Sequence, residues 1–146
     1  MPRRNFVFPS PTFREITDED TKKQFQNELF QNGDALIECA SMNTENTHVF
    51  VYDDNDEILA IMVFHDFGSF FHVEYLMANR LFNPQTAGTK LIFLLEDLGK
   101  TLGYDHIELD ALVKKIQYYE ALGYAEVGVI QEGEYGKMSK MSKSLR

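Results

Sequence analysis

The sequence predicts one domain, covering residues 1–146, in which a central mixed and largely antiparallel β-sheet is flanked by α-helices. Three observations support this mixed α/β class. Strand-like segments rich in β-branched and aromatic residues follow one another between residues 49 and 81, leucines recur with helical spacing between residues 86 and 102, and a short strand and a second helix come next. A chain of 146 residues is the size of one ordinary domain, and no linker rich in Pro, Gly or Ser divides it.

The first forty residues predict a strand, a helix and a segment of ambiguous type. Residues 13–16 have the pattern of a short strand. Thr17 or Asp18 then caps a helix that runs to about residue 31, with acidic residues in its first turn and Gly33 just past its end. Residues 35–40 fit either a strand or a helical turn.

The middle of the chain predicts three consecutive antiparallel strands. Residues 49–52 and 58–64 are rich in β-branched and aromatic residues and flank the polar turn 53–56, which predicts a β-hairpin. A second turn at residues 66–69 leads into a third strand over residues 70–81.

The most regular pattern in the chain predicts a helix over residues 86–102. Four leucines recur there at helical spacing, and a glycine stands where a helix C-cap belongs. These residues are Leu91, Leu95, Leu98, Leu102 and Gly103.

The C-terminal part predicts a strand, a second helix and two closing strands. Residues 106–109 have the apolar pattern of a buried strand, and residues 113–122 predict a helix that a glycine ends. Two last strands over residues 125–130 and 135–142 turn at Gly133.

The chain is strongly acidic, and its charge is unevenly distributed. The formal net charge is −9, and the last ten residues hold four basic and no acidic residues, which leaves a net charge of −13 on residues 1–136. Such a field repels a nucleic-acid backbone and attracts cationic molecules such as amines, although an acidic surface also serves solubility alone. We therefore expect no nucleic-acid partner.

Cysteine content and hydropathy predict a cytoplasmic protein. Cys39 is the only cysteine, so no internal disulfide can form, and the spacing of a zinc site does not occur. The apolar run near the N-terminus, residues 6–8, is far shorter than a signal-peptide core or a membrane span. We expect neither secretion nor a membrane partner.

The segment 83–90, Asn-Pro-Gln-Thr-Ala-Gly-Thr-Lys, is expected to join a strand that ends near Phe82 to a helix that starts near Thr89. At a helix N-terminus the first backbone N–H groups have no partner within the helix, and the macrodipole adds positive charge. Because Ala87 and Gly88 are small, a pyrophosphate could approach this backbone closely. An ordinary strand-to-helix loop has a similar composition, so the segment alone leaves both interpretations open.

Two motifs resemble those of the GCN5-related N-acetyltransferases (GNATs). Residues 85–90 resemble the family's Q/R-x-x-G-x-G/A turn, and residues 118–124, Tyr-Tyr-Glu-Ala-Leu-Gly-Tyr, resemble its second signature, an aromatic-Tyr pair followed by a Gly-aromatic helix end. The likeness covers roughly residues 70–145. It implies a GNAT-like acyl-CoA N-acyltransferase fold, in which the sheet splays between its central parallel strands and acetyl-CoA binds in the opening as a co-substrate.

The resemblance also implies which residues bind acetyl-CoA. The residues that would hold the pyrophosphate are Gln85, Ala87, Gly88, Thr89 and Lys90, and those that would flank the pantetheine arm are Ala78 and Arg80. Three positions depart from the family pattern. Lys90 stands in place of a Gly or Ala, Arg80 in place of an apolar residue, and Leu112 in place of a frequent Asn. These changes bear on the affinity and orientation of the co-substrate and leave the backbone cradle in place.

Acetyl transfer needs an acid for the departing thiolate and a base for the amine. By the resemblance, Tyr119 is the acid; the other interpretation is a core aromatic on an amphipathic helix. Glu74 is placed like the catalytic glutamate of the histone-modifying branch and would draw a proton from the amine, unless it lies on a solvated face. His72, on the same strand face, is a second candidate base. No third ligand joins these two residues, so we expect no metal.

The predicted function is an N-acetyltransferase that moves an acetyl group from acetyl-CoA to an amine by direct attack in a ternary complex. The acceptor would be a small molecule or a peptide amine, and homodimers are frequent among proteins of this likeness. The alternative is a catalytically inactive GNAT-fold protein with a binding, inhibitory or assembly role, as is known among tailed phages. The three departures from the family pattern give this alternative weight.

Overall fold

The computed structural model describes residues 4–17, 42–54, 57–78, 84–128, 131–133 and 136–146. Along the chain its elements are β1 (Phe13–Glu15), β2 (Thr47–Asp54), β3 (Glu57–Asp66), β4 (Phe70–Ala78), α3 (Pro84–Leu102), β5 (His106–Leu112), η1 (Val113–Lys115, a single 3-10 turn), α4 (Ile116–Ala121), β6 (Ala125–Glu126), β7 (Gln131–Gly133) and β8 (Gly136–Ser144). The helix expected to end near residue 31 and the ambiguous segment 35–40 lie outside the described residues.

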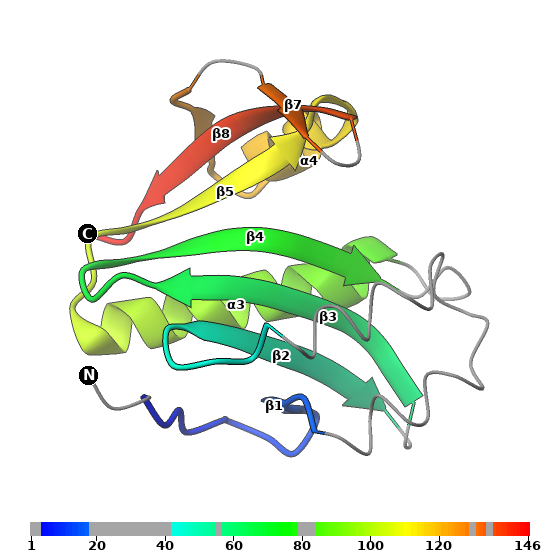
Figure 1. Ribbon diagram of the computed structural model, residues 1–146, viewed down its shortest axis with the longest axis vertical. Helices are drawn as coiled ribbons and strands as arrows, with labels where there is room; N and C mark the ends of the chain where they lie inside the picture. Colours follow the sequence, from blue (N-terminus) through cyan, green and yellow to red (C-terminus); the bar gives the residue numbers. More distant parts are fainter. Residues whose placement is uncertain (1–3, 18–41, 55–56, 79–83, 129–130, 134–135) are drawn as a thin grey trace.

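Eight strands of the described chain form one sheet, with the order β1-β2-β3-β4-β5-β8-β6 and with β7 paired to β8. Strands β4 and β5 are parallel, whereas the other pairs are antiparallel. The long helix α3 connects the two parallel strands and covers one face of the sheet (Figure 1). The predicted mixed and largely antiparallel sheet flanked by helices is therefore confirmed.

The predicted hairpin in the middle of the chain is confirmed, and its strands are longer than predicted. Strands β2 and β3 pair antiparallel up to Asp54 with Glu57, with a register shift after Tyr52, and residues 55–56 lie outside the described residues. At the turn from β3 to β4, the backbone N–H of Gly68 donates to Asp66 Oδ1 (2.9 Å), and Gly68 has a φ of 85°. Glycine accepts this left-handed conformation at little cost, which explains the residue at this position.

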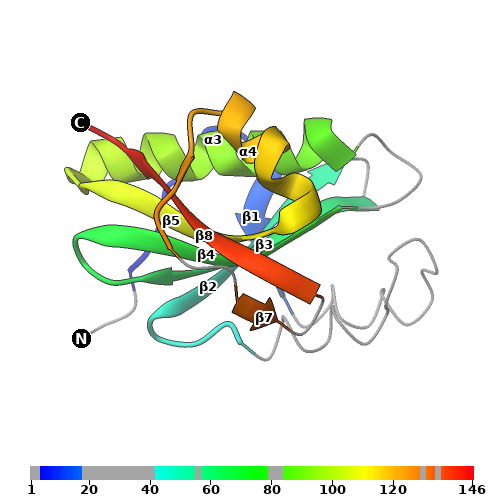
Figure 2. The same ribbon diagram turned by 90° about the horizontal axis from the view of Figure 1, so that it is seen from above.

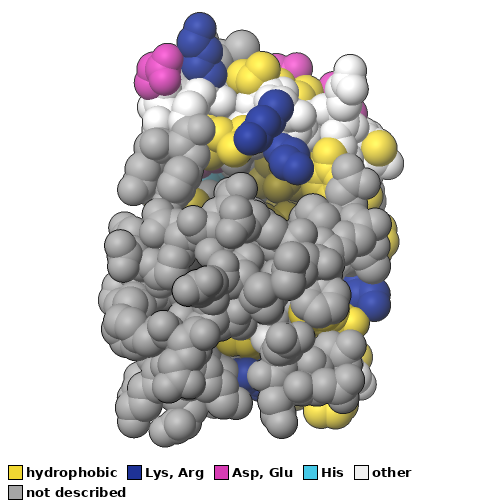
Figure 3. Space-filling model, turned by 90° about the vertical axis from the view of Figure 1, so that its right-hand side faces the viewer, with side chains coloured by type: hydrophobic (Ala, Val, Ile, Leu, Met, Phe, Trp, Pro, Cys, Tyr) yellow, Lys and Arg dark blue, Asp and Glu magenta, His cyan; other side chains and the backbone are white. Residues whose placement is uncertain are grey.

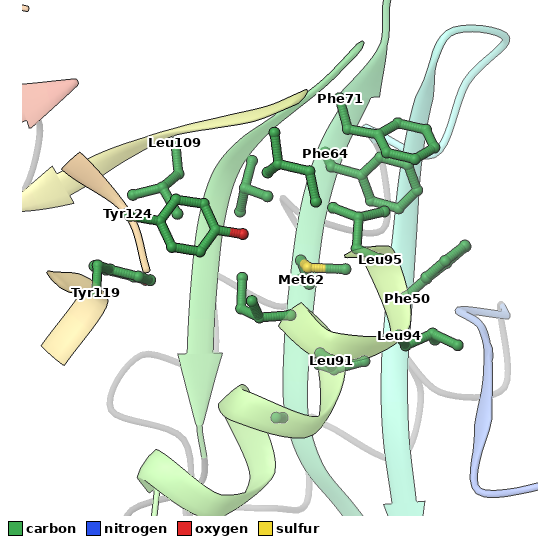
Figure 4. Packing of buried hydrophobic residues seen from close by; sticks show 14 of the residues in the cluster. Phe50, Met62, Phe64, Phe71, Leu91, Leu94, Leu95, Leu109, Tyr119 and Tyr124 are labelled. Carbon is green, nitrogen blue, oxygen red and sulfur yellow. The ribbon is translucent and has the colours of Figure 1, made fainter. Parts of the chain in front are cut away.

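The main core lies between the sheet and α3, where aromatic side chains from three adjacent strands pack edge to face (Figure 4). Phe64 contacts Phe50 and Phe71 with ring centroids 4.8 and 5.2 Å apart. Leu91 and Leu95, two of the predicted helical leucines, are fully buried against them. A second apolar cluster covers the opposite face of the sheet and includes Ile16, Val49, Val51, Ile58, Ile61 and Val63. Both faces of the N-terminal half of the sheet are therefore covered.

The start of α3 is where the sequence-based prediction was least accurate. Helix α3 begins at Pro84, five residues before the expected start near Thr89. Strand β4 is described to Ala78, and residues 79–82, over which the strand was expected to continue, lie outside the described residues. Proline is favoured at the first helical position because its φ is already helical and it has no N–H to satisfy. The end at Leu102 is confirmed, with Gly103 at a φ of 75°. Among the described helices, none is long and apolar enough to cross a membrane.

Helices α3 and α4 lie on the same side of the sheet (Figure 2). The second predicted helix, residues 113–122, is a 3-10 turn followed by the six-residue α4. A polar network inside the core joins these helices to β8: Glu96 of α3 accepts hydrogen bonds from the Tyr124 hydroxyl (2.9 Å) and from Lys143 Nζ (3.0 Å). The same ammonium donates to the carbonyl of Leu122 (2.9 Å), which fixes the end of α4.

Candidate functional site

The sheet forks between its two parallel strands. Strands β4 and β5 pair only from Phe70 with His106 to Val73 with Leu109. Beyond this point β4 stays paired with β3 and β5 stays paired with β8, so the two halves of the sheet diverge (Figure 1). The first residues beyond the fork are Glu74 on β4 and Asp110 on β5.

A β-bulge places Glu74 at the vertex of this fork. In the pairing of β3 with β4, Phe64 is opposite Val73 and Val63 is opposite Tyr75, so Glu74 is an extra residue with no opposite partner. A bulge of this kind interrupts the alternation of side chains along the strand. As a result, Val73 and Leu76 both pack in the cluster against α3, whereas Tyr75 packs on the opposite face.

The N-terminal end of α3 packs on the part of β4 that lies beyond the fork, where Gly88 is next to Leu76. By helix geometry, the amides of Gln85 and Thr86 are the ones without a partner inside a helix that begins at Pro84. Gly88 lies one turn further in and is therefore not at the free end, contrary to the expectation from the sequence. A Cβ atom at Gly88 would meet the Leu76 side chain at 3.4 Å, an ordinary van der Waals distance, so α3 packs on β4 here without requiring a glycine.

Thr89 and Lys90, two residues expected to hold the pyrophosphate, are bonded to side chains of the protein. The hydroxyls of Thr89 and Tyr118 are 2.6 Å apart and join the first turns of α3 to α4. Lys90 Nζ donates to the Tyr52 hydroxyl (2.9 Å) and lies 4.9 Å from the centre of that ring. A bound anion would have to share these groups or displace them.

The remaining residues of the predicted pyrophosphate cradle and pantetheine flank are placed as follows. Ala87 is buried in the cluster against α3. Ala78 pairs with Ala60 at the end of β4, where its backbone borders the fork. Arg80 and the side chain of Gln85 lie outside the described residues.

Tyr119 lies on the α3 side of the sheet, in α4. Its side chain is 8% exposed, and its ring contacts the rings of Tyr118 and Tyr124 at centroid distances of 4.9 and 6.1 Å. Burial, with a smaller contribution from Tyr118, raises the pKa of the Tyr119 phenol well above its usual value near 10. Tyr119 therefore keeps its proton at neutral pH and can act as a hydrogen-bond donor.

Glu74 lies on the face opposite α3 and is bonded to a histidine of the neighbouring strand. His65 Nε2 is 2.5 Å from Glu74 Oε2, and His65 Nδ1 is 2.8 Å from the hydroxyl of Thr47 on β2. The neighbour of His65 along the strand, Phe64, faces α3, so His65 and the carboxylate point to the other side. Glu74 is thus held at the fork rather than lying free on a solvated face.

His72, the second candidate base, is held between two carboxylates of β5. Its Nδ1 is 3.1 Å from Glu108 Oε1, and its Nε2 is 3.0 Å from Asp110 Oδ2. Both ring nitrogens are therefore engaged. Among the described residues, no group of His, Cys, Asp and Glu has the arrangement of a metal site.

His65 is the residue of this site that the sequence reasoning missed. It lies nine positions before Glu74 and has no motif around it. The hairpin turn at residues 66–69 was predicted, and antiparallel pairing across that turn places His65 opposite His72. Counting register across the hairpin would therefore have brought His65 close to Glu74.

Exposed lysines lie close to the open side of the fork. Figure 3 views this side, and its upper part, which holds β5, β8 and α4 in Figure 1, shows both Lys or Arg and Asp or Glu side chains beside hydrophobic ones. In the 3-10 turn that follows β5, Val113, Lys114 and Lys115 are exposed. A phosphorylated ligand entering here would meet cations despite the net charge of −9 on the whole chain.

Comparison with known proteins identifies the family. Residues 14–145 match the family model of the acetyltransferase (GNAT) domain. A search of curated proteins gave no match.

Solved structures of similar fold are acetyltransferases. The ribosomal-protein-S18-alanine N-acetyltransferase from Escherichia coli has a TM-score of 0.71 and 16% sequence identity, over 92% of this chain and 93% of that one. The aminoglycoside 6'-N-acetyltransferase from Enterococcus faecium has a TM-score of 0.69 and 16% identity, over 92% and 97% of the two chains. An aminoglycoside 6'-N-acetyltransferase complexed with coenzyme A has a TM-score of 0.64 and 16% identity, over 92% and 97%. At these identities the likeness shows the fold alone.

Proposed function

Since this chain belongs to the GNAT family of acetyltransferases, we propose that it transfers an acetyl group from acetyl-CoA to an amine acceptor by direct attack in a ternary complex. The observation that carries the proposal is the fork itself. It has the start of α3 and Tyr119 on one face of the sheet and Glu74 on the other. Family membership implies acyl transfer from an acyl-CoA; the acetyl group and the roles of individual residues are part of the proposal.

The start of α3 supports binding of the co-substrate's pyrophosphate. The amides of Gln85 and Thr86 and the helix dipole together favour an anion at this end of the helix. Ala78 would flank the pantetheine arm through the backbone at the end of β4. Lys90 and Thr89 would contribute side-chain contacts, which compete with their bonds to Tyr52 and Tyr118. The proposed acetyl-CoA-binding residues also include Arg80, which would flank the pantetheine arm, and Ala87, which would belong to the pyrophosphate cradle.

The proposed reaction moves two protons of an acceptor ammonium. Glu74 takes the first proton, which leaves the nitrogen lone pair free to attack the thioester carbonyl carbon. The new C–N bond forms and the C–S bond breaks, and the thiolate takes a proton from the Tyr119 hydroxyl. The second proton of the nitrogen is released as the amide forms and restores the phenol directly or through solvent, so that atoms and charges balance.

The acceptor is proposed to be an amine of a small molecule or of a peptide. The negative net charge and the carboxylates beside the fork favour a molecule that is cationic at neutral pH. The relatives of similar fold act, by their names, on a ribosomal-protein alanine and on aminoglycosides, both of which are amine acceptors.

A thermal-shift experiment with coenzyme A tests the binding site. A ligand at 100 times its Kd stabilises a protein by about 2.7 kcal/mol, which for a chain of this size raises Tm by about 5–10 °C. Lys90→Glu should weaken binding by about 5- to 30-fold, because it reverses a charge at the start of α3. Lys100→Glu is the matched control, since it reverses an exposed charge in the last turn of the same helix. Unchanged Tm of the wild-type chain at millimolar ligand would favour the inactive binding or assembly role instead.

A thiol-release assay with a panel of amines tests the chemistry. Tyr119→Phe should lower kcat by about 100-fold or more, the usual contribution of a general acid, while coenzyme A still raises Tm as in the wild type. Tyr104→Phe is the control, because it removes the hydroxyl of another buried tyrosine, which lies outside α4 and donates to Asp66. Equal turnover of the Tyr119→Phe variant and the control would remove Tyr119 from the mechanism.

A further inference from the structure

A chain of three side chains from three adjacent strands ends at the fork. It runs from the hydroxyl of Thr47 on β2, through both ring nitrogens of His65 on β3, to the carboxylate of Glu74 on β4. Both ring nitrogens of His65 thus lie within hydrogen-bond reach of an oxygen, at 2.8 Å from Thr47 and at 2.5 Å from Glu74, the second distance being shorter than that of an ordinary N–H···O bond. Only Oε2 of Glu74 takes part, which leaves Oε1 available at the fork.

The bulge is what brings the last two members of this chain together. Strict pairing would place a single residue of β4 between Val73 and Leu76, whereas the structure holds both Glu74 and Tyr75 there. The extra residue turns its side chain toward the strand that carries His65. The bulge interrupts the pairing of β3 with β4 and also brings the Glu74 carboxylate to His65. This combination points to a role beyond packing.

We infer that His65 is a positioning residue for acyl transfer, which orients the Glu74 carboxylate at the fork and takes up, through it, the proton released by the acceptor. The inference rests on the proposed function, because Glu74 is the proposed base. Thr47 is the third member and orients the imidazole ring.

The proton transfer through this chain is balanced as follows. In this relay Nδ1 of His65 carries the ring proton and donates to the Thr47 hydroxyl, and Glu74 Oε2 carries the proton of its bond to Nε2. The acceptor ammonium gives a proton to Glu74 Oε1 while Oε2 passes its proton to His65 Nε2. The products are a neutral amine, a Glu74 carboxyl group protonated on Oε1 and an imidazolium, so the pair gains the one proton that the ammonium loses. Because imidazole is a stronger base than a carboxylate, the pair takes up this proton more readily than a carboxylate alone.

The structure separates His65 from the other histidine on this face. His72 is 6.3 Å from His65 between ring centres, but its nitrogens are bonded to two β5 carboxylates and not to Glu74. The described titratable groups linked to the His65–Glu74 pair are His72 on β4 and, through His72, Glu108 and Asp110 on β5, with His106 Nε2 3.7 Å from Glu108.

The test compares three variants by kcat, by KM for acetyl-CoA and by the pH profile of kcat. His65→Gln places a polar amide beside Glu74 and cannot take up a proton. Thr47→Val removes the contact to Nδ1, and His106→Gln is the control, since that ring stacks on Phe70 (4.6 Å) at the closed end of the fork. Ring-nitrogen NMR of the free protein, with and without Glu74→Gln, reports the His65–Glu74 contact independently of activity.

The expected result is a fall in kcat of about 10- to 100-fold for His65→Gln, the size of effect that misplacing a catalytic group produces. KM for acetyl-CoA should stay within about twofold of wild type, because His65 lies on the face opposite α3. The limb of the pH profile in the range where histidine titrates should disappear, and Thr47→Val should show a smaller fall. In the NMR spectra, Glu74→Gln should change the ring-nitrogen signals of His65 and not those of His106.

Two outcomes would overturn the inference, and they differ from each other. If the wild-type chain acetylates an amine and His65→Gln matches His106→Gln in kcat and pH profile, His65 has no role in the reaction and the proposed function still stands. If the wild-type chain acetylates no amine of the panel while the NMR contact between His65 and Glu74 is present, the proposed function fails and the role of His65 fails with it. A fall in kcat with a retained Tm supports the inference.

Discussion

Replacement of Glu96 by leucine should destabilise the fold by an amount that can be worked out from the structure. The Glu96 carboxylate is 6% exposed and accepts one hydrogen bond from Tyr124 and one from Lys143. Without it, the Tyr124 hydroxyl, which belongs to a side chain that is 3% exposed, stays in the core with no acceptor. Leaving a buried hydroxyl without a partner costs about 1–3 kcal/mol.

The loss of the ion pair between Glu96 and Lys143 lowers stability by less than the burial of Glu96 suggests. The Lys143 side chain is 27% exposed, and its ammonium keeps its bond to the carbonyl of Leu122. We therefore assign this contact only about 0.5–1 kcal/mol. Together the two terms give a loss of about 2–4 kcal/mol for Glu96→Leu, which corresponds to a fall in Tm of about 5–15 °C for a chain of this length.

Urea denaturation followed by circular dichroism measures this loss, and a double-mutant cycle assigns it. Tyr124→Phe should cost about 1 kcal/mol in the wild-type background and should restore about 1–3 kcal/mol with Glu96→Leu, because it removes the unpaired hydroxyl, which corresponds to a coupling of about 2–4 kcal/mol. Glu120→Leu, at an exposed position of α4, is the control and should change stability by no more than about 0.5 kcal/mol. Equal costs of Tyr124→Phe in both backgrounds would refute the reasoning.

Three other predictions concern stability. Gly88→Ala should raise the free energy of unfolding by about 0.5–1 kcal/mol, because the new methyl group meets Leu76 at an ordinary 3.4 Å inside a helix; a loss of stability in urea would contradict this. Burial and the bond to Asp66 raise the pKa of Tyr104 to about 12, so its contribution to stability is present below pH 10 and is lost as the pH rises toward 12; thermal melts of Tyr104→Phe should show a weaker decline over that interval than wild type. His48 is fully buried, and neither ring nitrogen has a partner within hydrogen-bond distance among the described residues, Nδ1 lying 3.6 Å from Glu15 Oε1. His48→Leu should therefore stabilise the chain by about 1–2 kcal/mol, and a Tm below that of wild type would show that the contact with Glu15 stabilises the fold.

The order of strands and helices was predictable because local signals agreed with the tertiary structure. The hairpin turn at residues 53–56, the leucine spacing of α3 and the glycine after it each act within a few residues. Pro84 also carried a signal for the start of α3, but the helix was predicted to start five residues later, near Thr89 and just after Gly88. The start of a helix is difficult to predict where a proline and a glycine close to each other both fit a boundary.

The contacts of the candidate site were less predictable, because they depend on register. Glu74 and Tyr119 were identified as candidates through motifs and their spacing. The partner of Glu74, His65, is found only by pairing β3 with β4, and the bulge that aligns them leaves no mark in the residue types of β4. Likewise, the bond between Thr89 and Tyr118 joins elements that are 29 positions apart in the chain. Such contacts follow from packing rather than from local pattern.

The extra residue in β4 has a consequence for how this strand can vary. Up to Val73 the residues facing α3 have odd numbers, and after the bulge Leu76 faces it with an even number. Deletion of Glu74 would remove the bulge and still leave Tyr75 opposite Val63 and Leu76 facing α3 beneath Gly88, whereas regular pairing with Glu74 retained would turn Tyr75 into the helix-facing core. The core could therefore accept a strand that is one residue shorter, but His65 would lose its carboxylate partner.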